Sequence, residues 1–430
     1  VIFVRGKIIP EHKNPINRFL IWIYRPVIHG VLQAKTLVIL LALGALAVTV
    51  WPARQLGTEF MPDLNEGTLL YMPTTLPGIS VTKASELMQT QNRIIKSFPE
   101  VASVYGKAGR AATATDPAPS EMFETVVNLR PKQEWRKGLT LDGLIAEMDK
   151  ALQFPGVSNA WTMPIKARID MLSTGIRTPV GVKVIGPDLA VIDKLARQVE
   201  QVLKAVPGTS SAYAERNLGG YYLEITPNRE ALARYGIAVQ DVQDTIATAL
   251  GGQSVTTTVE GRQRFTVNMR YPRDLRDNPG AIANDILVPM PAGGAVPLGE
   301  VANVTPARGP SSIRTENGQL ATYIYVDIRD RDLGGYVADA QRAVQASVLF
   351  PPGTYLVWSG QYEYLERAAA RLKIVVPVTL AIIFLLLYLN FRSVAETLIV
   401  MLSLPFALVG GLWLMWALGF NLSVAVAVGF

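Results

Sequence analysis

The stretch TLVILLALGALAVTVWPA, residues 36–53, runs for 18 positions without a charged side chain. A helix of that length nearly matches the ~30 Å apolar thickness of a bilayer. Residues 374–391 form a second uncharged stretch of 18 positions, and residues 397–430 form a third of 34. The third is too long for one ordinary crossing and contains GFNLS at 419–423, which predicts a helix, a tight turn and the start of another helix. The chain is therefore expected to be a membrane protein with α-helical transmembrane segments.

Positive charge collects before the first stretch. Residues 1–35 contain six Lys or Arg and one Glu, so they hold +5 of a net charge of +6. A cationic flank predicts a cytoplasmic end, which sends residues 54 to about 370 outside the membrane. This placement argues against nucleic acid as a partner. Residues 17–33 set apolar and aromatic side chains between Arg18 and Arg25, which fits either a helix lying on the lipid bilayer surface or a tilted extension of the first span.

The exterior region repeats one pattern four times. A helical stretch ends in an apolar residue, then proline, a turn and a β-rich run, at residues 98–101, 154–157, 206–209 and 350–353. Proline cannot continue a helix, so the pattern predicts four β-α-β units, two in each ferredoxin-like α+β subdomain. The first two units are contiguous, at about 62–174. The third and fourth, at about 178–217 and 318–360, are separated by some 100 turn-rich residues, which predicts an inserted domain.

Metal-binding and catalytic residue types are scarce outside the membrane. The chain has no Cys, and both of its histidines, His12 and His29, precede the first span. The exterior region also lacks a phosphate-binding loop of the Gly-x-x-x-x-Gly-Lys kind, so an enzyme is not expected. Methionine is the only soft donor there, and thioethers favour Cu(I) or Ag(I) over Zn(II).

Four runs give the sequence a recognisable identity: FMPDLNEG at 60–67, RIDMLSTGI at 168–176, SGQYE at 359–363 and LPFALVGG at 404–411. In these runs the chain resembles the heavy-metal efflux branch of the resistance-nodulation-division (RND) transporters, and within it the copper and silver pumps. The resemblance implies a secondary active transporter, a proton antiporter of the bacterial cell inner membrane, with a large domain in the periplasm. It implies a homotrimer that works with a periplasmic membrane-fusion adaptor and an outer-membrane channel. It implies no cofactor, only Cu(I) or Ag(I) as the transported ion.

The resemblance also divides the chain, as a C-terminal-half fragment of a longer protein. A cytoplasmic or interfacial amphipathic segment is expected at 1–35. Three membrane helices are expected at 36–53, 371–391 and 397–418, and the start of a fourth is expected at 421–430. The first porter subdomain is expected at 54–174, the second at 175–217 and 318–370, and a docking domain at 218–317. No ionisable residue lies within the three uncharged stretches, so the proton-relay groups are expected in helices outside this chain.

The resemblance carries the family's three-methionine metal site onto Met72, Met122 and Met171. Methionine is also a common core filler, so local context matters. In a strand from Met122, alternation places Met122 and Glu124 on the less apolar face. Met171 lies among polar residues, which suits a cleft lining, whereas the apolar neighbours of Met72 fit either a ligand or a core residue.

Charged positions near the family's site correspond to Glu66, Asp116, Glu124, Arg168 and Arg177. They are expected to attract the cation or shape the cleft, although charges of this kind are more often solvated surface groups. Two other functions fit the same residues. One is a sibling pump for divalent zinc, cobalt or cadmium, which would need harder ligands near the cleft. The other is a non-transporting periplasmic scaffold that binds metal or docks an adaptor.

Overall fold

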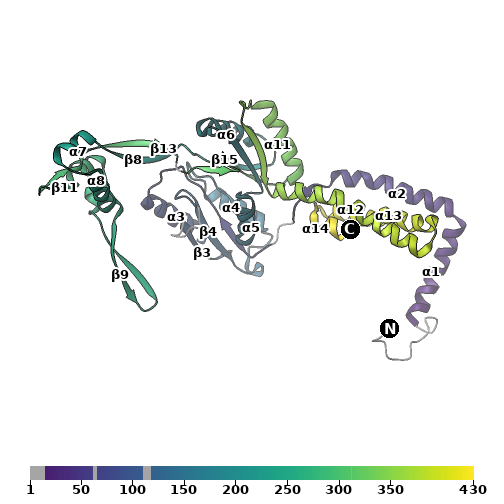
Figure 1. The fold of residues 1–430 in the computed structure, drawn as a ribbon. Coiled ribbons are helices and arrows are strands. Elements are labelled where there is room, and N and C mark those ends of the chain that lie inside the picture. The colour runs from purple at the N-terminus through teal and green to yellow at the C-terminus, as the bar shows by residue number, and fades with distance from the viewer. Residues whose placement is uncertain (1–14, 62–64, 110–117, 311) are drawn as a thin grey trace.

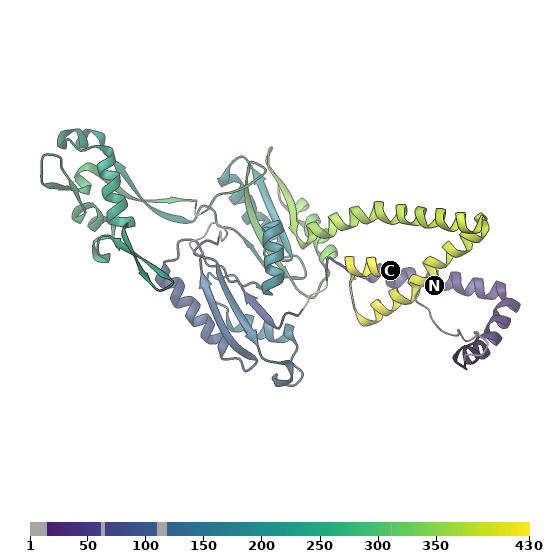
Figure 2. The same cartoon turned by 60° about the horizontal axis from the view of Figure 1, so that its bottom comes forward.

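The computed structural model describes residues 15–61, 65–109, 118–310 and 312–430. Long helices gather at one end of an elongated molecule, two α+β layers follow, and a smaller unit with a projecting hairpin lies at the far end (Figures 1 and 2). The described chain thus separates the apolar stretches from the mixed α+β region, as the sequence predicts.

Among the described residues, three helices are long and apolar enough to cross a membrane: α2 (Lys35–Gln55), α12 (Gln361–Phe391) and α13 (Val394–Leu418). Helix α12 begins well before the predicted span at 371, so it extends from the α+β region into the apolar stretch as one helix. Helix α1 (Pro15–Gln33) is separate from α2 (Figure 1). The predicted break is present: Gly419 ends α13 with a left-handed φ of 70°, and α14 (Val424–Gly429) follows.

Tryptophans join α2 to α13. The indole Nε1 of Trp413 donates to Thr49 Oγ1 at 3.0 Å, and Nε1 of Trp416 donates to Gln55 Oε1 at 2.8 Å. Strand β1 (Thr58–Glu59) pairs in parallel with β17 (Leu422–Ser423). The segment that follows the first span is therefore hydrogen-bonded to the bend that follows the third.

The first sheet is built from β2 (Thr68–Tyr71), β3 (Val101–Ala108), β4 (Phe123–Leu129) and β5 (Trp161–Thr162), in the order β3-β4-β2-β5. Two β-α-β units with antiparallel neighbours produce this order, which is the split β-α-β arrangement. Helices α3 (Val81–Lys96) and α4 (Leu141–Ala151) cover one face, around Leu69, Tyr71, Ile95, Val127 and Leu144. Each helix begins at a hydroxyl cap, Ser80 or Thr140, that accepts a backbone N–H three residues on. Helix α5 (Pro164–Thr174) lies over the other face.

The second sheet repeats the arrangement with β6 (Val180–Gly186), β7 (Thr209–Ala214), β15 (Gln319–Ile328) and β16 (Tyr355–Gly360), in the order β7-β15-β6-β16, with β14 (Arg314–Glu316) also beside β15. Helices α6 (Leu189–Lys204) and α11 (Leu333–Ser347) cover one face and enclose a large apolar core. The opposite face presents tyrosines and charged side chains, including Tyr213, Tyr323 and Tyr325.

The insertion between β7 and β15 is a separate unit. Strands β8 (Gly220–Pro227) and β13 (Ala302–Gly309) pair antiparallel and connect it to the second sheet (Figure 1). Its own core lies among α7 (Arg229–Tyr235), α8 (Val239–Ile246), α9 (Pro279–Asp285), α10 (Leu298–Val301), β11 (Leu287–Pro289) and β12 (Ala295–Pro297). The hairpin of β9 (Gln253–Glu260) and β10 (Gln263–Met269) projects from it with every strand residue exposed. The turn-rich interval therefore folds around its own core.

Candidate metal centre

Three methionines from distant parts of the chain meet under α5. Met72 follows β2, Met122 precedes β4 and Met171 lies on α5. Met72 and Met122 are only 1% and 6% exposed, and Met171 is half-buried. All three belong to one small apolar cluster, whose other members are Leu70, Ala118, Val126, Ala160 and Ala167. The three thioethers are thus neither far apart nor sealed in separate cores.

Backbone pairing sets the positions of the first two methionines. The N–H of Met72 donates to Ala160 O at 2.9 Å, and Met122 forms an isolated antiparallel bridge with Thr74. Alternation along β4 buries Phe123, Thr125 and Val127 toward α3 and α4, which leaves Met122 and Val126 on the α5 side. The alternation separates Met122 from Phe123 as the sequence predicts, but the face expected to be the more polar one carries an apolar cluster under α5, in which Met122 is buried.

Helix α5 is held at both ends. Glu66 accepts hydrogen bonds from the backbone N–H groups of Ile165 at 2.9 Å and Lys166 at 3.0 Å. Pro164 stands at the first turn, where a missing N–H costs nothing. Gly175, with a φ of 76°, closes the other end. Glu66, expected as a cleft charge, is therefore the carboxylate that caps the helix carrying Met171.

The remaining expected charges have different settings. Glu124 is half-buried and pairs with Lys107 at 3.1 Å, while Arg168 is exposed on α5. Asp116 lies outside the described residues. Arg177 is buried: its guanidinium donates to Thr74 Oγ1 at 2.5 Å and lies 4.2 Å from the centre of the Tyr325 ring.

A small cavity of about 30 Å³ adjoins the cluster, between the first sheet and the tyrosine face of the second. Thr74, Glu121, Met122, Arg177 and Asn217 are among its lining residues. Two buried atoms of these residues, Arg177 Nε and Asn217 Oδ1, find no hydrogen-bond partner in the described part of the chain. Burial raises the pKa of the Glu121 carboxyl, and the nearby carboxylate of Glu215 adds to that rise. Met122 therefore borders both the methionine cluster and a polar cavity.

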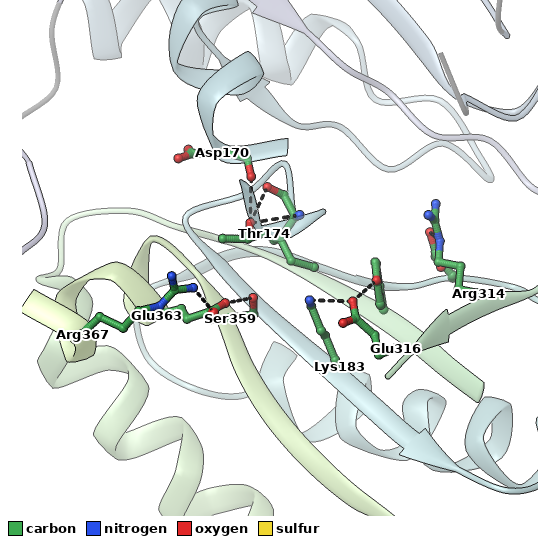
Figure 3. A network of polar contacts seen from close by, with 11 residues as sticks. Asp170, Thr174, Lys183, Arg314, Glu316, Ser359, Glu363 and Arg367 are labelled. Carbon is green, nitrogen blue, oxygen red and sulfur yellow. Dashed lines mark hydrogen bonds and ion pairs between the residues drawn. The ribbon is translucent and has the colours of Figure 1, made fainter. Parts of the chain in front are cut away.

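Sequence reasoning missed several polar contacts of α5, the second sheet and α12, and Figure 3 shows those around Thr174, Ser359 and Lys183. Gln361 Nε2 donates to Asp170 Oδ2 at 3.0 Å, and Ser359 Oγ donates to Glu363 at 2.7 Å. Lys183 pairs with Glu316 at 2.7 Å; burial opposes ionisation of Glu316, but the Lys183 hydrogen bond holds its pKa below the usual range. The available sequence signal was the spacing of Asp170, three residues after apolar Ala167, which places both side chains on one face of α5.

The chemistry of the methionine cluster suits a soft ion. In the described ranges no group of three or more His, Cys, Asp or Glu side chains could hold a metal. Three neutral thioethers can surround a d10 monovalent ion without adding charge, and they attract harder divalent ions poorly. The arrangement can therefore hold Cu(I) or Ag(I) better than Zn(II).

Comparison with known proteins gives consistent matches. The sequence model of the AcrB/AcrD/AcrF family matches residues 5–430. The chain is 50% identical over 430 residues to the cation efflux system protein CusA of Escherichia coli (strain K12), and 49% identical over 429 residues to the putative cation efflux system protein SilA of Salmonella typhimurium. All of this chain is covered in both alignments, and 41% of each relative.

More distant relatives match this chain over nearly the same length. The cobalt-zinc-cadmium resistance protein CzcA of Cupriavidus metallidurans is 34% identical over 425 residues, which cover 96% of this chain and 40% of that protein. The crystal structure of a heavy metal efflux pump superposes with a TM-score of 0.85 at 29% identity, covering 97% of this chain and 43% of that chain. The chain therefore spans about two fifths of the length of the curated relatives it matches.

Proposed function

The chain belongs to the AcrB/AcrD/AcrF family, and from this premise we propose that it is part of a proton-driven pump that exports Cu(I) or Ag(I) across the bacterial inner membrane. The convergence of Met72, Met122 and Met171 carries the proposal. The thioethers bind the ion without neutralising it, so capture is selective and release stays possible. The names of CusA and SilA as cation efflux proteins support this reading.

The two sheets supply the porter subdomains of this proposal, and the inserted unit supplies the docking domain. Their contacts near the methionines, Gln361 with Asp170 and Arg177 with Thr74, join parts that must move if the metal is alternately admitted and released. The assembly is a homotrimer that engages a periplasmic adaptor and an outer-membrane channel. Proton-relay groups lie in other membrane helices, since ionisable residues are absent from the three uncharged stretches.

Two alternatives remain to be separated by experiment. The 34% identity to CzcA favours a pump for divalent zinc, cobalt or cadmium, but the described residues offer no His, Cys or carboxylate cluster for such ions. A non-transporting metal-binding or docking scaffold would bind metal without conferring resistance.

The test is Met171→Ile in the intact pump, a change that removes sulfur with little change in volume. Ag(I) affinity should fall by more than roughly tenfold, and each factor of ten is about 1.4 kcal/mol of binding free energy. Copper and silver resistance of a pump-deficient host should fall with it. Met88→Ile, half-buried on α3 outside the cluster, is the matched control. Full affinity and full resistance in Met171→Ile would reject the site, and Zn(II) binding without Ag(I) binding would favour the divalent alternative.

A further inference from the structure

Arg177 is a buried cation without a carboxylate partner. Arg177 is 8% exposed, and its guanidinium forms no ion pair within the described part of the chain. Its polar contacts are the hydrogen bond to Thr74 and the face of the Tyr325 ring. Its Nε atom has no hydrogen-bond partner among the described residues. Burying an uncompensated charge is costly, so its position needs an explanation.

The guanidinium lies next to the methionine cluster. Thr74, which accepts its hydrogen bond, stands opposite Met122 in the antiparallel bridge. Side chains directly opposite in such a pair lie on one face, about 4.5–5.5 Å apart at Cβ. Thr74, Met122 and Arg177 also line the same small cavity. The charge of Arg177 is therefore held within roughly 10 Å of an ion bound by the thioethers.

The other charges around the cavity are largely engaged elsewhere. Glu215 accepts from Arg314 Nε at 2.9 Å and from the Tyr325 hydroxyl at 2.8 Å. Arg216 pairs with Glu200 at 2.7 Å. Glu121 lines the cavity but forms no ion pair with Arg177. Arg177 and Glu121 are thus the charges on this wall for which no ion pair is formed among the described residues.

We propose that Arg177 sets the charge selectivity of the methionine site, an inference that rests on the proposed function. Three thioethers leave the full charge of the bound ion exposed to the guanidinium. At roughly 10 Å and an effective dielectric constant of about 20, the repulsion weakens binding by on the order of tenfold for each unit of charge on the ion. A divalent ion is penalised twice in this way, and a monovalent ion once. Arg177 therefore excludes divalent ions and keeps a monovalent ion loosely enough bound to leave.

The experiment titrates the full-length trimeric pump with Ag(I), and then displaces the bound Ag(I) with Cd(II), a d10 ion of twice the charge. Arg177→Gln should bind Ag(I) roughly tenfold more tightly than the parent does. Its affinity for Cd(II) should rise by the square of that factor, because the ion carries twice the charge. Lower concentrations of Cd(II) should therefore displace Ag(I) from the variant than from the parent. Arg177→Leu, which keeps an apolar stem against the Tyr325 ring, should behave like Arg177→Gln.

Two controls separate charge from packing. Arg177→Lys keeps the charge and should retain the parent ratio of Cd(II) to Ag(I) affinity. Arg93→Gln removes an exposed charge from α3 and should change neither affinity. The proposal is overturned if both charge-removing variants keep the parent ratio or lose Ag(I) binding, or if Arg177→Lys shifts the ratio as much as they do. Met171→Ile in the same titration distinguishes the two proposals. If Met171→Ile lowers Ag(I) affinity but the Arg177 variants keep the parent ratio of Cd(II) to Ag(I) affinity, only the selectivity inference fails.

Discussion

Gln361 donates a hydrogen bond of 3.0 Å to the carboxylate of Asp170, which joins the first turn of α12 to α5. Asp170 is buried and directly precedes Met171. Because α12 continues without interruption to Phe391, one helix leads from the apolar stretch to the side chain next to a proposed ligand. A displacement of α12 therefore acts on α5 through this contact.

Replacing Gln361 with leucine should loosen α5. The change removes one donor from the buried Asp170 carboxylate, and a hydrogen bond to a charged group is worth about 1.5–3 kcal/mol. Amide hydrogen exchange within residues 165–174 should accelerate, and Ag(I) affinity should fall. Gln89→Leu, at an exposed position on α3, is the control and should leave both unchanged. Unchanged exchange in α5 of Gln361→Leu would show that the contact transmits nothing.

Removing the cap on α5 should fray its first turn. Glu66→Ala withdraws the acceptor of the Ile165 and Lys166 N–H groups, and loss of an N-terminal cap costs about 0.5–2 kcal/mol. Fast exchange should appear first at these two amides. Glu86→Ala breaks an exposed pair with Lys83 and should cost less than about 1 kcal/mol. Equal effects of the two variants would mean that Glu66 is only a surface charge.

Stability should depend on pH through Asp327. Burial raises the pKa of its carboxyl to about 6, against the opposing pull of Arg329. The unfolded chain, with an ordinary Asp pKa of about 3.9, binds fewer protons between those values, so stability falls as pH rises from about 4 to about 6. Asp327→Asn should remove this slope from the denaturant midpoint and raise the midpoint at pH 7. The exposed Asp277→Asn should keep the slope, and a slope that survives in Asp327→Asn would assign it to another group.

The contact between α2 and α13 should depend on Thr49. Thr49→Val keeps the shape but removes the acceptor of the Trp413 indole, and hydrogen bonds between membrane helices are worth about 0.6–1.7 kcal/mol. The variant should lose about that much unfolding free energy in detergent, with a change in tryptophan fluorescence. Thr36→Val, exposed near the start of α2, is the control. A loss in both variants alike would exclude a specific role for the indole contact.

Local and periodic signals were enough to predict much of the fold. Uncharged runs such as 36–53 form helices because a helix satisfies its own backbone hydrogen bonds within one segment, as an apolar solvent requires. Proline stops such as Pro99 and Pro207 marked the β-α-β units, since proline lacks the N–H that would continue the helix and its ring clashes with the preceding turn. Alternation along β4 separated the side chains into two faces, because the period of a strand is a property of the chain alone, but it did not show that α5 would bury Met122.

Contacts between distant residues were decided by the tertiary structure. The sequence by itself determined that Met72, Met122 and Met171 are the soft donors to consider, but their meeting depends on how α5 lies over the first sheet. It marked Glu66 and Arg177 as charges, yet only packing made one a helix cap 99 residues away and the other a buried cation. The physical reason is that burial and pairing depend on which segments the topology brings together, and no local pattern records that.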